Sequence, residues 1–230
     1  MTDLLSLSLL SVVLTLVAFR LGQVLQAKFK SPLLNPILIA VILVILFLSL
    51  TGMPGETYQA GMKSLSWLMT PATIALAIPM YEQFQALRKN LKAIALGVGA
   101  GALSCLGMVA LLGLLFGFDR SLTVSLLPKS ITTAIGVSLS EIAGGIPSVT
   151  TAAIIFTGIF ANILGSFFCR LFHIGDPVAQ GVAFGTAGHV IGTARANELG
   201  TLTGAVSSLS LVVAGLLTAL VLPLLAGILV

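Results

Sequence analysis

Ionisable side chains in residues 181–200 are the first candidates for chemistry in this chain. His189, Arg195 and Glu198 stand there among glycines and threonines, in a sequence that is otherwise strongly apolar. An ionised Arg at the centre of a bilayer costs about 2.5–3.5 kcal/mol on insertion scales, so such groups mark functional sites by default. Arg can hold a carboxylate through two hydrogen bonds, and His titrates near neutral pH and can carry a coupled proton. The predicted substrate-binding residues here are Thr186, His189, Thr193 and Arg195, and the predicted proton-coupling residues are His189 and Glu198.

Three spacings in this stretch bear on that prediction. Arg195 and Glu198 are three residues apart and can instead form a surface ion pair on a helix. His189 and Arg195 are six apart, so only a break near Gly192 would bring both to one cavity. The glycines at 181, 185, 188 and 192 recur at steps of four, three and four, which places them on one face of a helix. That face allows the close approach either of a ligand or only of a neighbouring helix. The predicted backbone and packing positions are Pro71, Pro128, Gly185, Gly188 and Gly192.

A second candidate site is the sequence Pro128-Lys-Ser-Ile-Thr-Thr133. Proline is favoured at the first helical position, and a helix that begins there directs free N–H groups and its positive dipole end at an anion. Lys129 adds a full positive charge. We therefore predict an anion site formed by Lys129, Ser130, Thr132 and Thr133. The alternative is that Lys129 only extends toward the membrane interface.

The composition is that of a membrane protein. Hydrophobic residues make up 57% of the 230, charged residues only 8%, and Lys and Arg exceed Asp and Glu by 11 to 7. The mean hydropathy is +1.15. So few and scattered cations do not suit nucleic acid; they suit loops that orient a chain in the bilayer. In lipid, backbone N–H and C=O groups must be hydrogen-bonded within the protein, and a chain that does not close into a barrel achieves this only as a helix. We therefore predict an all-α polytopic membrane protein with a single integral membrane domain over residues 1–230.

Apolar runs give the expected membrane segments. Five are uninterrupted, at 4–19, 33–50, 93–118, 148–172 and 204–229, and three are interrupted, at 65–85, 122–143 and 178–199. Runs of about 20 apolar residues can span a bilayer, so we predict about seven to eight segments with broken or re-entrant helices. Loop charges place 88–92 on the cytoplasmic side, and Arg170 favours a segment 122–143 that returns to the side it enters.

The sequence contains a faint internal repeat. Residues 71–78 and 128–135 share the pattern P-x-[ST]-I-x-x-A-I, which predicts possible repeat halves at about 30–118 and 119–230. Paired, proline-interrupted segments point to the binding site of a secondary transporter. Two ordinary kinked helices are the alternative.

Several activities lack their residues. The sequence has no GxxxxGK[ST], HExxH or GxSxG motif and no tight cluster of metal-ligating residues, so we expect no enzyme activity, cofactor or metal. Cys105 and Cys169 stand in apolar surroundings with no CxxC spacing, and we expect inert buried thiols.

The chain resembles the LrgB/CidB family of bacterial inner-membrane proteins over nearly its whole length. The matching landmarks are Pro32-Leu-Leu-Asn-Pro36, Pro71-Ala72, Tyr81-Glu82-Gln83, Leu127-Pro-Lys-Ser130, Thr132-Thr133, Gly144-Gly-Ile-Pro147, Gly185-Thr-Ala-Gly-His189, Ile191-Gly-Thr-Ala-Arg195, Glu198-Leu199, Gly204-Ala205 and Ser207-Ser208. Departures from the family pattern are Gly188, where relatives commonly have Ser, and Ala134, where many have Pro.

The resemblance implies two functions. Family members are described as holin-like or antiholin-like regulators of murein hydrolase activity and autolysis, usually with a small LrgA-type membrane partner. A plastid relative resembles a glycolate/glycerate exporter, and bacterial relatives are linked to pyruvate uptake. We therefore expect a transporter of small monocarboxylates, ion- or proton-coupled or exchanging, in the bacterial cytoplasmic membrane, with holin-like or antiholin-like regulation as the alternative. The resemblance also implies a homo-oligomer or a complex with an LrgA-like protein.

Overall fold

The computed structural model describes residues 2–29, 34–68, 71, 74–75 and 77–228. Every regular element in those ranges is a helix, which confirms the predicted all-α class. The chain forms two compact units, Met1–Ala75 and Leu76–Val230. The expectation of one domain over 1–230 stays a prediction, and each unit is described by itself.

The first unit is built around a pair of helices. Its elements are α1 (Thr2–Phe29), α2 (Pro36–Thr51), α3 (Gly55–Gly61) and α4 (Lys63–Ser66). Asn35 fixes the start of α2, because its Oδ1 accepts hydrogen bonds from the N–H groups of Ile37 at 2.8 Å and Leu38 at 3.3 Å. Gly52 ends the helix in the left-handed conformation, at φ 67°.

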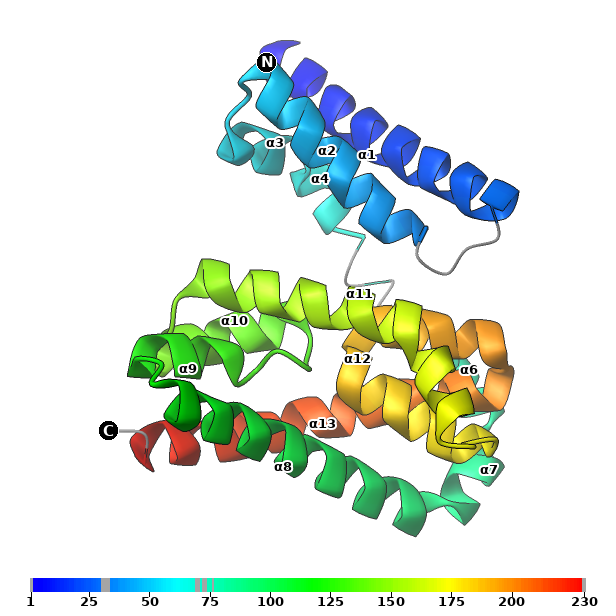
Figure 1. Ribbon diagram of the computed structural model, residues 1–230. Helices are drawn as coiled ribbons and strands as arrows, with labels where there is room; N and C mark the ends of the chain where they lie inside the picture. The colour runs from blue at the N-terminus through cyan, green and yellow to red at the C-terminus, as the bar shows by residue number, and fades with distance from the viewer. Residues whose placement is uncertain (1, 30–33, 69–70, 72–73, 76, 229–230) are drawn as a thin grey trace. The chain divides into compact units, whose positions relative to one another are not determined.

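The second unit holds three long helices with short or broken helices between them (Figure 1). Its elements are α6 (Ala77–Glu82), α7 (Phe84–Lys89), α8 (Leu91–Phe116), α9 (Arg120–Leu126), α10 (Thr133–Ile142), α11 (Pro147–Leu171), α12 (Pro177–Leu199) and α13 (Thr201–Ile228). At one end the core joins Ile94 and Val98 of α8 to Val206 of α13. At the other end it joins Leu106 of α8 to Leu222 of α13.

Four described helices are long and apolar enough to cross a bilayer: Leu7–Phe29, Leu91–Phe116, Pro147–Leu171 and Thr201–Ile228. Large apolar side chains such as Leu96, Leu114 and Leu220 are exposed on them, as lipid requires. The chain is therefore a multi-pass membrane protein. The fifth uninterrupted run corresponds to α2, whose 16 residues reach about 24 Å against a hydrocarbon core of about 30 Å. The count of seven to eight segments is not confirmed.

The interrupted segment at 122–143 is a helical hairpin. α9 enters beside the end of α8, a turn at 127–132 follows, and α10 returns. Ser121, at the start of α9, donates a hydrogen bond to the carbonyl of Gly144 at 3.1 Å, and the N–H of Ile146 donates to Ser125 Oγ at 2.6 Å. The two ends of the segment therefore lie side by side, which matches the predicted return to the side of entry.

α12 is a second hairpin, broken at His189, where φ is 43° and ψ is −137°. Its first half packs against α13 through Gly181, next to Val206. Its second half packs against the same stretch of α13, where Thr193 Oγ1 lies 2.8 Å from Ser207 Oγ. The segment therefore begins and ends at the same end of the unit, and the predicted interruption of 178–199 is confirmed.

The two hairpins enter the second unit from opposite ends, and their tips meet near its middle (Figure 1). Ile154 of α11, which is fully buried, lies between them. Its side chain packs beside Gly136 at the start of α10, and its carbonyl oxygen lies 2.9 Å from His189 Nε2. Five of the seven Lys and Arg residues of this unit stand at the end where α8 begins, which supports the prediction that this end is cytoplasmic.

The predicted repeat is not confirmed. Residues 72, 73 and 76 of the motif at 71–78 lie outside the described residues, and Pro71 is exposed in a helical turn of the first unit. A different order of elements does recur. In the second unit, a long helix followed by a helical hairpin occurs twice, over 91–146 and over 147–200.

Candidate functional site

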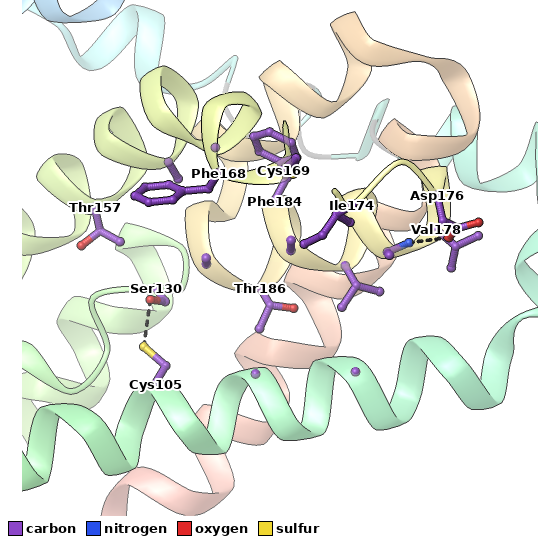
Figure 2. A pocket seen from close by; sticks show the side chains of 18 of the residues that line it. Cys105, Ser130, Thr157, Phe168, Cys169, Ile174, Asp176, Val178, Phe184 and Thr186 are labelled. Atoms are coloured by element: carbon purple, nitrogen blue, oxygen red, sulfur yellow. Dashed lines mark hydrogen bonds between the residues drawn. The ribbon is translucent and has the colours of Figure 1, made fainter. Parts of the chain in front are cut away.

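A pocket of about 720 Å³ lies where the two hairpin tips approach α8 and α11. One wall is a face of α8, the other wall belongs to α11, and the first half of α12 forms the floor. Figure 2 shows Cys105, Ser130 and Thr157 toward one end of this pocket, Phe168, Phe184 and Thr186 along it, and Asp176 and Val178 toward the other end. The first end is the tip of the first hairpin, and the second is where α12 begins.

Lys129 occupies the tip of the first hairpin and lines the pocket. Its Nζ donates to Cys105 Sγ and to Ser130 Oγ, both at 3.3 Å, and these two partners lie 3.2 Å from one another. Both partners are neutral groups, and within the described part of the chain no carboxylate lies at ion-pair distance from this ammonium. Because Cys105 is near the middle of α8, the Lys129 ammonium lies at mid-height of the helical bundle, half-buried and with no counter-charge among the described residues.

The helix that follows begins later than the sequence predicts. α10 starts at Thr133, with Thr132 at its N-cap, so the predicted helix start at Pro128 is wrong by five residues. The residues between Pro128 and Thr133 form turns instead of a helix. In these turns the N–H of Lys129 donates to the carbonyl oxygen of Leu126, and the N–H of Ile131 donates to the carbonyl oxygen of Pro128, each at 3.2 Å. Thr132 and Thr133 stand at the start of α10 and are not among the residues that line the pocket.

Thr186 brings the second hairpin to the same place. Its side chain is 6% exposed, and its Oγ1 has no hydrogen-bond partner among the described residues. It lines the large pocket and also a cavity of about 10 Å³ that it shares with Ser130 and Ile131. A buried hydroxyl without a partner costs about 1–3 kcal/mol, so this group would gain from any hydrogen-bond partner that reached it.

His189 forms the break of α12 rather than a pocket wall. A non-glycine residue at φ 43° stores about 1–3 kcal/mol of backbone strain. Its ring is 3% exposed and bonds the carbonyl oxygen of Ile154. Because a carbonyl oxygen only accepts, Nε2 carries the proton. Gly158 of α11 leaves room for this ring, since a Cβ there would lie 2.6 Å from it.

The other predicted residues of α12 lie away from the pocket. Thr193 Oγ1 donates to the carbonyl of His189 at 2.8 Å and braces the break. Arg195 Nη1 and Glu198 Oε2 are 2.5 Å apart, with side chains 34% and 64% exposed, and Arg195 Nε donates to Ser166 Oγ at 3.1 Å. The geometry is that of the surface ion pair that the sequence left open as an alternative.

The predicted packing glycines face three different neighbours rather than one ligand. A Cβ on Gly185 would overlap the carbonyl oxygen of Ser207 in α13, one on Gly188 would lie 2.6 Å from Ala161 of α11, and one on Gly192 would lie 2.5 Å from the carbonyl oxygen of Phe184. Each position allows a close approach that a side chain would prevent.

The structure therefore gathers Lys129, Ser130 and Thr186 at one pocket. It adds one group that the sequence analysis missed, the thiol of Cys105, which was expected to be an inert core group. A signal for it exists: Ala93, Gly97, Gly101 and Cys105 recur every four residues, and a small-residue stripe of this kind marks a close approach on a membrane helix.

Broken helices that enter from opposite ends and meet at a cation-containing pocket define a class of multi-pass membrane proteins with a site inside the helical bundle. The model of the LrgB-like family matches residues 15–228. The chain is similar to antiholin-like protein LrgB of Bacillus mycoides (strain KBAB4), Bacillus cereus (strain B4264) and Bacillus anthracis (strain CDC 684 / NRRL 3495), in each case with 36% identity over 93% of both chains. No solved structure matches. The chain belongs to the LrgB-like family.

Proposed function

We propose that this chain is an antiholin-like membrane protein that, with a small LrgA-type membrane partner, restrains murein hydrolase activity and autolysis. The observation that carries the proposal is its 36% identity, over 93% of both chains, to relatives named antiholin-like protein LrgB. Close packing behind the hairpin tips supports it, because the second cavity there, which Ser130 and Thr186 share with Ala214 of α13, is only about 10 Å³, room for about one water. Close packing at this point suits a protein that limits membrane permeability.

The test uses cells that lack their own LrgB-type gene. Expression of the full chain together with the partner is expected to slow autolysis and to weaken the murein hydrolase bands in a zymogram. Expression of the partner alone is the control. Unchanged autolysis, with the chain present in the membrane at normal levels, would refute the proposal.

A second candidate function is transport of small monocarboxylates such as pyruvate, glycolate or glycerate. It is favoured by the pocket that ends at Lys129, a cation with only neutral partners among the described residues. The starts of α10 and of the second half of α12 both lie near Ile154, as in carriers whose half-helices converge on a substrate. Both candidate functions are non-enzymatic, and formation of homo-oligomers stays a prediction.

Uptake by proteoliposomes tests transport directly. Labelled pyruvate, glycolate and glycerate are expected to enter with saturation, and Lys129→Met is expected to reduce the initial rate at least tenfold. Lys92→Met, at an exposed position in the first turn of α8, is the matched control. Unsaturable flux, or equal rates in Lys129→Met and the unaltered chain, would exclude this site as a carrier site.

A further inference from the structure

The pocket extends along α8. Its lining follows one face of this helix from Asn90, at the N-cap, through Gly97 and Gly101 to Cys105. The 15 residue steps from Asn90 to Cys105 correspond to about 22 Å. The pocket therefore extends from the end of the unit where α8 begins to the hairpin tips, and a three-carbon acid at Lys129 would leave most of its 720 Å³ unfilled.

The two parts of the pocket differ in chemistry. At the tip end lie the Lys129 ammonium and the Ser130 hydroxyl, and Thr186, whose buried hydroxyl lacks a partner among the described residues, lines the pocket next to them. The remainder is lined mainly by apolar groups, with Val182 and Phe184 of α12 and Phe168 of α11 among them. Figure 2 shows Phe184 near the middle of the pocket and the ring of Phe168 on the side of Thr157. Asn90 and the exposed Asp176 carboxylate lie at the far end, where α12 begins. The cationic end and the apolar middle suit a ligand whose anionic group lies at the tips and whose apolar body extends away from them.

We propose that the pocket binds an amphipathic organic monoanion, a carboxylate that carries an extended apolar body. The carboxylate accepts hydrogen bonds from Lys129 and from the hydroxyls at the tips, and the body lies along the small-residue face of α8. A mostly apolar pocket of roughly 300–1,000 Å³ with a few polar groups is typical of ligands of that size. This inference rests on the second candidate function, since it assigns a ligand class to the same site.

Binding of a homologous series to the full chain in lipid nanodiscs tests the proposal. Acetate, butyrate and hexanoate share one headgroup and differ only in apolar length. Each buried CH₂ increases affinity by roughly fourfold, so hexanoate is expected to bind at least tenfold more tightly than acetate after subtraction of empty nanodiscs. Lys129→Met is expected to weaken hexanoate at least tenfold, and Lys92→Met to leave it unchanged.

A second variant separates the apolar part from the cation. Ala183 lines the pocket and is exposed, so Ala183→Phe fills the apolar part without a buried clash and is expected to weaken hexanoate but not acetate. Equal affinities across the series, still dependent on Lys129, would overturn this inference and leave transport of small acids standing. A length dependence that survives in Lys129→Met would overturn it in favour of a lipid-like groove. No binding of any acid would overturn both.

Discussion

Replacement of Lys129 by Met is expected to stabilise the protein while it removes the site. A Lys at the centre of a membrane helix costs about 2.5–3.5 kcal/mol on insertion scales, and Lys129 is only half-buried, so part of that cost is relieved in the native state. The variant also loses two hydrogen bonds to neutral groups, each worth about 0.5–1.5 kcal/mol net. Cys105 and Ser130 keep one another as partners at 3.2 Å, so neither is left unsatisfied.

The balance of these terms is a gain of about 1 kcal/mol at most, because the two lost hydrogen bonds offset about 2 kcal/mol of an insertion cost of about 3 kcal/mol. Thermal unfolding of the purified chain in a single detergent measures it, with a rise of roughly 2–4 °C expected in the midpoint. Lys92→Met is the control and is expected to change stability by less than about 0.5 kcal/mol, as exposed substitutions do. A lower midpoint for Lys129→Met, with an unchanged control, would show that the ammonium is a structural anchor and would refute the reasoning.

Three further outcomes follow from the packing of α12. Gly185→Ala forces a Cβ into a backbone carbonyl of α13 and is expected to destabilise by about 1–3 kcal/mol. Gly99→Ala, in the interior of α8 with open space around it, is expected to stabilise by up to about 1 kcal/mol. Equal thermal midpoints for the two variants would contradict this. His189→Gly places at this positive φ a residue that adopts it without strain, and His189→Ala does not. The Gly variant is therefore expected to be more stable than the Ala variant by about 1 kcal/mol or more in thermal unfolding. The reverse order of stability would count against strain at the break. Arg195→Gln and Glu198→Gln, alone and together, are expected to change stability by less than about 1 kcal/mol in a double-mutant cycle, and a larger coupling would mean that this pair is not a simple surface contact.

The positions of the helix breaks could be predicted because their causes are visible in the chain. Pro128 and the nearby Lys129 interrupt an apolar run, and a glycine-rich polar stretch interrupts another. Lipid does not tolerate unsatisfied backbone, so such segments have to be broken inside protein. The position of Arg170 also gave the expectation that 122–143 returns to the side it enters, and the hydrogen bonds between the two ends of this segment match it.

The membership of the site could be predicted only in part. Lys129, Ser130 and Thr186 share the pocket, but the approach of Cys105 depends on how the first hairpin packs against α8, which no local pattern contains. His189 was expected to face a ligand because of its chemistry. Its positive φ turns the ring toward α11 instead, and glycine, not histidine, is the residue from which such a conformation is normally inferred.

The two candidate functions place opposite demands on one small contact, the packing of the hairpin tips around Ile154. A carrier has to open this contact toward each side in turn, so its two arrangements should differ by only a few kcal/mol. An antiholin-like regulator gains from a contact that stays closed. Ile154 is fully buried and touches both hairpins, through its side chain at Gly136 and its carbonyl at His189. Movement of either tip therefore breaks a packed contact or a hydrogen bond with the same residue. The positive φ of His189 adds strain of about 1–3 kcal/mol to this arrangement, so a carrier would gain from movement of the tips only if that movement relieved the φ of this one residue.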